Sequence, residues 1–531
     1  MSNLSLFLSP DAYKLGHILQ YPDNTEFVYS NFTPRSARHL LATQPEGLKD
    51  DTIVAVGMYN AVREIQRMFQ DFLKLPPHYV EEKLEPFFRD FAPDTTLLRS
   101  RIKQLRELGY LPLVIKALPE GTLVKPNTPV LTIYNTHNDF AWLVNYLEDV
   151  ISNLIWKPMV AATIARPYRQ LFMGYANLTG SPKEFVDFQG HDFSVRGMGG
   201  PEDARRSGMG HLTQFVGTDN IGAAAEMHDA FDVIPGILVG ASIPATEHSV
   251  MCAGGKDNEF DTYHRLITKI YPSGMVSIVS DTWDFFGVLT DIASALKSEI
   301  MNRDGKVVFR PDSGDPVDII AGTARVLYPE KGEYICDQEP GIYIVDNVYY
   351  QWAGEYFMED PSEPITNVIA EPTPQMKGAV EVLWGEFGGT TTDTGHKLLD
   401  EHVGLIYGDS ITLERAYKIL AALERKGFAS ANIVFGIGSY TYQYITRDTI
   451  GAAMKATYAV VDGEGRELEK SPITDATKKS RCGLLRVDYD GTVYDGCTWA
   501  GQQQGMLEII FEDSVLNPKP ELGLVRRRAR S

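Results

Sequence analysis

The sequence has few cysteines and no long hydrophobic run, and both absences argue against whole classes of protein. Four cysteines stand among 531 residues, at positions 252, 336, 482 and 497, and none forms a CxxC pair or a Cys/His zinc spacing. We therefore expect free thiols in a reducing compartment. No apolar stretch approaches the roughly 20 residues that span a bilayer, and the first residues lack the basic and apolar regions of a signal peptide. The protein is expected to be cytoplasmic, with no membrane partner.

Positive charge is also scarce. Lys and Arg number 50 against 70 Asp and Glu, so the formal net charge is −20. Nucleic-acid binders carry a basic footprint, and this balance argues against one. Because an acidic protein repels anions at long range, a site for a phosphorylated substrate must be a local cluster of cations. The chain also has no GxxxxGK[ST] run, which disfavours a P-loop kinase or ATPase. The basic tail at residues 525–530 is expected to be solvated and frayed.

A recurring pattern occupies residues 184–458. A short β-branched or aromatic run ends in a polar turn, and an apolar-periodic segment follows. The predicted strands are residues 185–188, 212–216, 237–239, 276–279, 307–309, 403–407 and 433–435. Strands that alternate with helices predict parallel β/α units, and this many in succession favour a barrel over a short open sheet. The active site of such a sheet lies in the loops at the carboxyl ends of the strands.

The two ends of the chain have a different pattern. Residues 60–73 and 96–108 have the periodicity of amphipathic helices, and residues 113–136 predict short strands joined by tight turns. The part from 459 to 531 is also strand-rich. We expect residues 1–183 and 459–531 to form one α+β accessory domain. An insertion at about 329–399, which includes the runs 341–345 and 381–384, interrupts the barrel pattern and is predicted to be mostly β.

Four acidic residues lie between a predicted strand and a predicted helix, namely Asp219, Asp281, Asp312 and Asp409. Aspartate is a favoured helix N-cap, so each residue alone fits that role. As a set on one face of a barrel, the carboxylates would repel each other unless they bind a cation or orient a partner. Mg²⁺ that bridges a pyrophosphate is the natural candidate, because this ion takes a few carboxylates plus substrate phosphates.

Cations lie near the same turns: Arg196, Arg310, Arg447, Lys455, Lys478, Lys479 and Arg481. Arginines and glycine-rich turns between a strand and a helix hold phosphates in many proteins. The turn at residues 435–439, with Gly438 and Ser439, fits such a cradle, although a Gly/Ser turn can also be only a turn. Lys478 and Lys479 fit a solvated loop as well.

His248 follows a predicted strand in the run Ser242–Ser249. A lone histidine is often structural, but Glu247 is adjacent and Asp281 is expected on a nearby strand end. An imidazole oriented by a carboxylate can attack a phosphoryl group or act as a general acid or base. Phe193, at another predicted strand end, offers either a stacking surface for a flat heteroaromatic substrate or a residue of the core rim.

With these motifs assembled, the sequence resembles the nicotinamide phosphoribosyltransferases, a family of type II phosphoribosyltransferases. The resemblance covers nearly the whole chain apart from the insertion. Many spaced matches together make it specific, whereas one alone would not. The matching runs are Asp11–His17, Tyr21–Thr25, Gly109–Pro112, His191–Phe193, Gly217–Asp219, Pro244–Ser249, Ser280–Asp281, Arg310–Gly314, Gly408–Asp409 and Thr446–Asp448.

The resemblance implies a homodimer with an α/β barrel and active sites at the dimer interface, which residues near 11–35 of the partner reach. It implies transfer of a phosphoribosyl group from phosphoribosyl pyrophosphate to nicotinamide, with Mg²⁺ as cofactor and ATP as co-substrate. In this family the nicotinamide ring lies between Phe193 and Tyr13 of the partner subunit. Asp219, near Ser242, accepts a hydrogen bond from the carboxamide, and a nicotinate carboxylate would be repelled there.

The remaining roles concern phosphate and chemistry. The resemblance implies that Arg310, Asp312 and Arg196 hold ribose and pyrophosphate. It also implies that ATP phosphorylates His248, with Glu247 and Asp281 as orienting groups, and that Asp281 and Asp312 bind Mg²⁺. The ribose and its 5′-phosphate are held by Gly408, Asp409, Ser410, Gly438, Ser439, Arg447 of the partner subunit, Lys455 and Lys478.

The sequence departs from vertebrate members at three places. Tyr440 follows Ser439 where they have a longer glycine run, Ser410 stands where they have glycine, and they lack the insertion. Two alternatives stay open. One is a nicotinate phosphoribosyltransferase, which Asp219 argues against. The other is a non-catalytic binding protein on the same fold, which the full set of His248, Asp281, Arg310 and Asp312 argues against.

Overall fold

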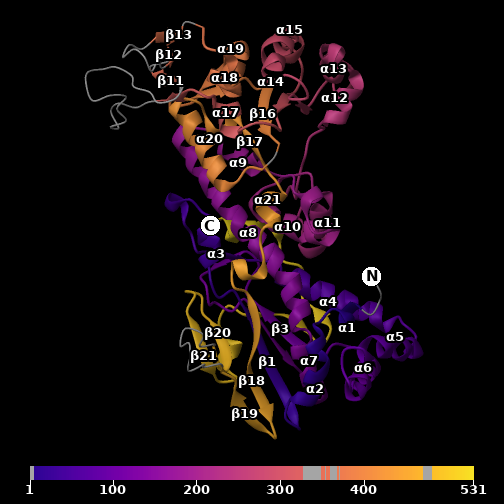
Figure 1. Ribbon diagram of the computed structural model, residues 1–531. Coiled ribbons are helices and arrows are strands. Elements are labelled where there is room, and N and C mark those ends of the chain that lie inside the picture. The colour runs from indigo at the N-terminus through magenta and orange to yellow at the C-terminus, as the bar shows by residue number, and fades with distance from the viewer. Residues whose placement is uncertain are drawn as a thin grey trace.

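The structure is a computed structural model, and it describes residues 5–326, 349–352, 355–358, 367–369, 371–408, 410–469 and 481–531. Its elements gather around two large sheets, which lie at opposite ends of the molecule (Figure 1). Among the described residues, no helix combines the length and the apolar character that crossing a membrane requires. The cysteines in this part of the chain, Cys252, Cys482 and Cys497, are free thiols, as the sequence predicts.

The first sheet has six parallel strands in the order β7-β6-β17-β16-β9-β8. Two isolated parallel bridges, Gly217 to Ala241 and Ala245 to Ser277, join its edge strands through the segment 241–245. The sheet is thereby closed into the predicted α/β barrel. Its strands are β6 (Gly190–Asp192), β7 (Gly217–Thr218), β8 (Val276–Val279), β9 (Val307–Arg310), β16 (Val403–Tyr407) and β17 (Val434–Ile437).

Helices connect and cover these strands, as expected for β/α units. They are α9 (Val186–Gln189), α10 (Pro201–Gln214), α11 (Ile221–Ala230), α12 (His248–Gly254), α13 (Glu259–Arg265), α14 (Phe285–Gly287), α15 (Ala293–Ala295), α16 (Lys297–Met301), α17 (Pro316–Ala321), α20 (Leu413–Arg425) and α21 (Ser439–Gln443). The apolar faces of helices such as α17 and α20 pack on the sheet in a core that includes Phe309, Leu405 and Phe435. Leu212 of α10 and Met227 of α11 belong to a separate apolar cluster with Leu522 and Val525.

The second sheet is antiparallel and draws strands from both ends of the chain, in the order β19-β18-β1-β5-β3-β22-β23. Its strands are β1 (Thr25–Thr33), β3 (Leu113–Ala117), β5 (Leu131–Asn135), β18 (Ala453–Val461), β19 (Glu464–Glu467), β22 (Glu508–Glu512) and β23 (Val515–Leu516). Two antiparallel pairs of strands accompany it, β2 (Ile53–Ala55) with β4 (Thr122–Val124), and β20 (Leu484–Val487) with β21 (Val493–Cys497).

Short helices complete this accessory part: α1 (Ser5–Leu8), α2 (His17–Gln20), α3 (Arg38–Ala42), α4 (Met58–Leu73), α5 (Pro77–Arg89), α6 (Thr96–Leu108) and α7 (Ala141–Tyr146). The amphipathic helices predicted at 60–73 and 96–108 are confirmed as α4 and α6. The strands predicted within 113–136 are confirmed as β3, β4 and β5.

One long helix, α8 (Glu148–Thr179), runs between the two ends (Figure 1). Ile151 and Ile155 in its first half belong to the accessory core. Phe172 and Ala176 in its second half belong to the barrel core. The two parts of the molecule therefore share a helix.

Three predicted barrel strands are wrong. Residues 185–188 lie in a helical turn and in α9. Residues 212–216 form the last turn of α10 and the start of the loop that follows it. Residues 237–239 belong to no strand. Each run is short and apolar, and such a run cannot be assigned to a strand or to a buried helical turn by periodicity alone. The predicted strands at 276–279, 307–309, 403–407 and 433–435 are confirmed within one or two residues.

The insertion contains a small sheet of β10 (Arg325–Val326), β11 (Tyr349–Trp352), β12 (Glu355–Met358) and β13 (Asn367–Ile369). It also contains helices α18 (Pro374–Lys377) and α19 (Ala379–Phe387), followed by β14 (Gly389–Thr391) and β15 (Lys397–Leu399). The predicted strand at 381–384 is wrong, because Ala379, Val380, Leu383 and Phe387 repeat at helical spacing and bury one face of α19. The predicted run at 341–345 lies outside the described residues.

The tail also differs from its prediction. Residues 522–530 form helix α22 (Leu522–Arg530), whose Leu522, Val525 and Ala529 are fully buried. These residues recur at i, i+3 and i+7, so the arginines between them do not prevent the helix from packing. Arg526 is itself buried.

Candidate active site

The loops at the carboxyl ends of the barrel strands bring together most of the residues singled out in the sequence. His248 begins α12, and its side chain is 47% exposed. Its Nε2 lies 3.8 Å from a carboxylate oxygen of Asp281, after β8, and 3.8 Å from one of Asp312, after β9. Its Nδ1 lies 3.2 Å from Thr282 Oγ1. A histidine and two carboxylates from three separate loops thus face one another.

Asp281 is fixed by the loop that follows β9. Its Oδ2 accepts hydrogen bonds from the backbone N–H of Asp312 (2.9 Å) and from Ser313 Oγ (2.5 Å). Its Oδ1 is buried and has no hydrogen-bond partner among the described residues. The carboxylate is therefore held in place through Oδ2, and its Oδ1 could coordinate a cation.

Arg310 ends β9 and reaches across the barrel mouth. Its Nη2 donates to the carbonyl of Thr246 (2.8 Å), and its Nε lies 3.5 Å from Asp312. Gly408, at the end of β16, makes this arrangement sterically feasible. A Cβ on Gly408 would lie 1.8 Å from Asp312 Oδ1.

The loops that end β6 and β17 also touch. A Cβ on Gly197 would lie 2.1 Å from Ser439 Oγ, so the exposed Arg196 stands next to the Gly438–Ser439 turn. Ser439 begins the short helix α21. Tyr440, the departure noted in the sequence, points outward and is 58% exposed.

A cavity of about 380 Å³ lies inside the barrel and opens among these loops. Phe193, Asp219, Ser242 and Arg310 line it, together with apolar side chains deeper in the barrel. A cleft that is mainly apolar, with a few convergent polar groups, suits a small aromatic ligand.

Asp219 is the acidic group of this cavity. His191 Nε2 donates to its Oδ1 at 2.9 Å, and Ser242 Oγ donates to the same oxygen. Burial alone would raise the pKa of Asp219. The two hydrogen bonds, from His191 and Ser242, together with the nearby positive charge of Arg310, outweigh burial and hold the pKa of Asp219 below its ordinary value. Asp219 is therefore a carboxylate at neutral pH.

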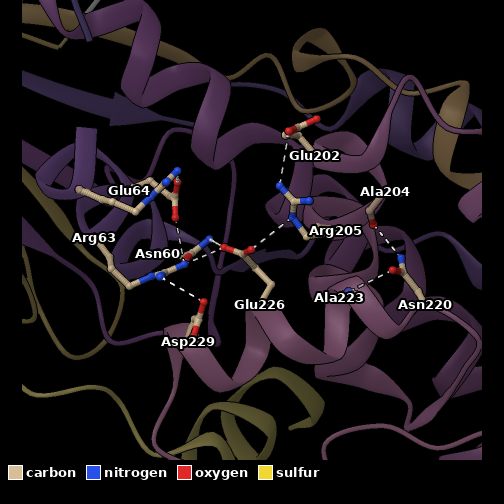
Figure 2. A network of polar contacts seen from close by, with 11 residues as sticks. Asn60, Arg63, Glu64, Glu202, Ala204, Arg205, Asn220, Ala223, Glu226 and Asp229 are labelled. Atoms are coloured by element: carbon tan, nitrogen blue, oxygen red, sulfur yellow. Dashed lines mark hydrogen bonds and ion pairs between the residues drawn. The ribbon is translucent and has the colours of Figure 1, made fainter. Parts of the chain in front are cut away.

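The helix behind Asp219 is anchored by a polar network (Figure 2). Asn220 caps α11, accepting from the Ala223 N–H (3.0 Å) and donating to the Ala204 carbonyl (2.8 Å). Further along α11, Glu226 accepts from Asn60 and Arg63 of α4. The network thus holds Asp219's helix against both α10 and the accessory part.

His191 is a site residue to which the sequence analysis gave no role. Its ring packs on Phe193, with centroids 4.5 Å apart, while its Nε2 holds Asp219. The signal was its place at the end of a strand in the His191–Phe193 run, two residues before Phe193. Glu247, which was singled out, is exposed and accepts a hydrogen bond from Ser249.

Two of the predicted site residues, Arg447 and Lys455, lie far from this cavity. Arg447 and Lys455 line a separate pocket of about 1270 Å³, the accessory pocket, which they share with Arg35 and Arg481. It borders β18, at the opposite end of the molecule from α12 (Figure 1). Asp409 and Lys478 lie outside the described residues. Ser410, after Asp409, has a left-handed backbone with φ of 57°.

Tyr13 is likewise distant, and it is 58% exposed in the accessory part. Its turn is clamped to the start of α8. The Asp11 N–H donates to Asp149 (3.0 Å), Lys14 pairs with Glu148 (2.8 Å), and His17 contacts Asn145 (2.5 Å). An exposed aromatic ring on a fixed turn is suited to contact something outside its own chain.

Comparisons with known proteins decide the family. Residues 188–496 match the nicotinate phosphoribosyltransferase (NAPRTase) family. The chain belongs to this family. It is 46% identical to the nicotinamide phosphoribosyltransferase of Acinetobacter baylyi, with 98% of this chain and 95% of that protein covered. It is 32% identical to the nicotinamide phosphoribosyltransferase of Mycoplasma pneumoniae, with 90% and 95% covered.

A solved structure supports the fold. The nicotinate-nucleotide pyrophosphorylase of Pyrococcus furiosus aligns with a TM-score of 0.52 at 14% identity, covering 99% of this chain and 95% of that one. The resemblance to type II phosphoribosyltransferases stated from the sequence is thus confirmed in family and in fold.

Proposed function

We propose that this protein is a nicotinamide phosphoribosyltransferase that joins nicotinamide to phosphoribosyl pyrophosphate, releasing nicotinamide mononucleotide and pyrophosphate. The observation that carries the proposal is the ionised Asp219 in the barrel cavity, held by His191 and Ser242. A carboxylate there accepts a hydrogen bond from a carboxamide N–H and repels the carboxylate of nicotinate. The names of the relatives from A. baylyi and M. pneumoniae support the same base.

The ring of the base would stack on Phe193, which packs on His191 and lines the cavity. We propose that Tyr13 of a second subunit covers the other face. Within one chain the exposed Tyr13 lies just before α2, which belongs to the accessory end and is remote from the barrel strands (Figure 1). The accessory pocket, with Arg447 and Lys455, would serve the partner's site in the same way. Family resemblance and this separation both favour a homodimer with shared active sites.

The pyrophosphate and ribose would lie among Arg196, Arg310, Asp312 and the Gly408 and Gly438–Ser439 turns. Arg196 lies exposed beside the Gly438–Ser439 turn, because the adjacent Gly197 packs on Ser439. No group of three or more acidic, histidine or cysteine side chains in the described part of the chain is arranged as a metal site. Asp281 and Asp312 nevertheless fit Mg²⁺, because Asp281 Oδ1 is buried and accepts no hydrogen bond from the described residues, and this ion takes one or two carboxylates plus substrate phosphates. When bound, Mg²⁺ would neutralise charge on the departing pyrophosphate.

The transfer itself needs no side-chain nucleophile on carbon. The bond between C1′ and the pyrophosphate oxygen breaks as the pyridine nitrogen attacks from the opposite face, and the sugar passes through an oxocarbenium-like state. Positioning by Phe193 and Asp219 and charge stabilisation by Arg310 would supply most of the rate enhancement.

We propose that His248 receives a phosphoryl group from ATP and thereby couples ATP hydrolysis to product formation. Its exposure makes it accessible to a nucleotide, and Thr282 on Nδ1 and the carboxylates near Nε2 orient its ring. Glu247 stands beside it in sequence as a further orienting group. We also propose that the enzyme works in the cytoplasm, where reduced thiols such as Cys252 persist.

Two alternatives give different outcomes in one assay. Turnover is measured with phosphoribosyl pyrophosphate, Mg²⁺ and either nicotinamide or nicotinate, with and without ATP. Wild type should use nicotinamide and gain activity with ATP. Asp219→Asn should lose about tenfold or more in preference for nicotinamide over nicotinate. Asp229→Asn, on the exposed end of α11, is the matched control, and it should leave turnover of both bases unchanged.

A preference for nicotinate in the wild type would favour the nicotinate phosphoribosyltransferase and refute the role of Asp219. Binding of ligands without turnover of either base would favour a non-catalytic protein. Activity that ATP does not stimulate would contradict only the role of His248.

A further inference from the structure

The segment that leads to Ser242 has little of its own to hold it in place. None of the side chains of residues 232–238 is buried, and Ile234 and Leu238 are 41% and 47% exposed. The run 237–239, which was expected to be a strand, makes no ladder with the barrel. Yet it runs directly into Ala241 and Ser242, which line the cavity.

The chain's last helix supplies the missing contacts. Just before α22, the Asp232 N–H donates to the Pro520 carbonyl (2.8 Å), and the Leu522 N–H donates to the Asp232 carbonyl (2.9 Å). Leu522 and Val525 then pack in the same apolar cluster as Val239. The segment is therefore fastened to the C-terminal region and not to the barrel strands.

Arg526 makes the main polar contacts between α22 and this segment. Its side chain is buried, and its guanidinium donates to three backbone carbonyls: Leu212 at 2.9 Å, Leu238 at 2.5 Å and Val239 at 2.5 Å. The first belongs to the end of α10 and the other two to the segment. A planar guanidinium offers several donors in a fixed fork, which lysine cannot reproduce.

The charge of Arg526 is compensated by the carbonyl end of α10. The last carbonyls of a helix carry partial negative charge, and Arg526 meets one of them at Leu212. Burial lowers the pKa of Arg526 to about 10, which leaves the guanidinium charged at neutral pH. Two neighbouring arginines also bind the end of α10: Arg530 donates to the Thr213 carbonyl and Arg169 donates to the Gln214 carbonyl.

The route from Arg526 to the base-binding residues is short. Two residues after Val239, the Ala241 N–H donates to the Val216 carbonyl, and the Ala241 carbonyl accepts from Thr218. Ser242 follows at once and donates to Asp219. A shift of the backbone at 238–239 would therefore reach Ser242 through only three residues.

We propose that Arg526 is a positioning residue for base recognition: by holding the carbonyls of Leu238 and Val239, it sets where Ser242 meets Asp219. The identity of the base rests on the proposed function. Phosphoribosyl pyrophosphate would be held by groups on β9, β16 and β17, which Arg526 does not touch. Loss of Arg526 should therefore weaken binding of the base selectively.

The test compares Arg526→Ala with Arg527→Ala, because Arg527 is exposed on the same helix. Arg526→Ala should raise KM for nicotinamide about tenfold, while kcat and KM for phosphoribosyl pyrophosphate change less than about twofold. Arg527→Ala should match the wild type. Guanidinium added at low millimolar concentration should lower the raised KM of Arg526→Ala, because it can occupy the vacated site.

A second variant covers the case in which Arg526→Ala does not fold. Arg526→Lys keeps the charge and part of the donor set, and it should show an intermediate rise in KM for nicotinamide. Hydrogen exchange of the peptide spanning residues 236–246 provides a readout that needs no turnover. It should become faster in either Arg526 variant and stay unchanged in Arg527→Ala.

Loss of thermal stability with an unchanged KM for nicotinamide would overturn the proposal and leave Arg526 a purely structural residue. An equal rise in KM for both substrates would overturn it as well. A wild type that turns over neither base would refute the proposed function instead. Hydrogen exchange of 236–246 and calorimetric binding of nicotinamide would then decide this inference.

Discussion

The two ends of the molecule present opposite chemistry. At the barrel end, the carboxylates of Asp281 and Asp312 surround His248, and one arginine, Arg310, spans the mouth. At the accessory end, a wide pocket contains no histidine; four cations line it, Arg35, Arg447, Lys455 and Arg481, together with the carboxylates of Glu467, Glu469 and Asp495. A sugar that carries a 5′-phosphate and a pyrophosphate needs both kinds of group. In the proposed function each end would supply half of a site, and one chain alone would be incomplete.

The largest effect is expected when the two ends are inactivated in separate chains and the chains are then mixed. Asp281→Asn and Arg447→Ala should each lower turnover about 100-fold, because each removes charge that faces the pyrophosphate or phosphate. Mixed dimers contain one intact site. Equal mixing with subunit exchange should therefore restore about one quarter of wild-type activity.

Arg466→Ala serves as the control for the accessory end, since Arg466 lies on β19 and does not line the accessory pocket. Mixed samples that stay as inactive as their parents would contradict shared sites. Full activity of Arg447→Ala alone would show that the accessory pocket plays no part.

Gly404 on β16 and Gly408 just after it test whether the position of Asp312 at the barrel end is fixed by close packing. Gly408→Ala should lower kcat/KM about 100-fold, because its Cβ would lie 1.8 Å from Asp312 Oδ1 and must displace that carboxylate. Gly404→Ala, four residues earlier, meets the flexible side chain of Lys306 at 3.0 Å and that of Val308 at 3.4 Å, and it should remain active. Steady-state kinetics and melting temperatures of both variants distinguish a local effect from misfolding. Equal activities would mean that Asp312 has no fixed position.

The smallest expected effect concerns pH. The pKa of Asp219 is held below its ordinary value, so the carboxylate survives until the pH falls through that lowered pKa. His191→Phe keeps a ring beside Phe193 but removes a hydrogen bond that stabilises the charged form. The pKa of Asp219 should then rise, and the acid limb of kcat/KM for nicotinamide should move to higher pH. His228→Phe, on the exposed side of α11, should leave the profile unchanged, and an unmoved limb in His191→Phe would contradict the role of this pair.

Sequence reasoning predicted the barrel because strands such as 276–279 and 403–407 carry an unambiguous β pattern and end in polar turns. It failed where tertiary contacts decide. The run 237–239 looks like a strand, but its backbone carbonyls are taken by Arg526 from the far end of the chain. No local signal in the tail discloses that partner, because alternating arginines and apolar residues also describe a solvated end.

The candidate site shows the same division. His248, Asp281 and Arg310 could be named because strand-end residues converge in a parallel barrel. The role of His191 could not, since its contact with Asp219 depends on the register between β6 and β7. That Tyr13 and Arg447 lie away from the cavity was also beyond local patterns, and only family resemblance indicated it.

Helix α8 adds a mechanical consequence. At 32 residues it is about 48 Å long, with one end clamped to the Tyr13 turn and the other embedded in the barrel core. It is in effect a lever: a tilt of about 5° at the barrel would carry the opposite end through about 4 Å. In the proposed dimer with shared sites, α8 would thus connect one barrel to the aromatic ring that its chain offers to the partner's site.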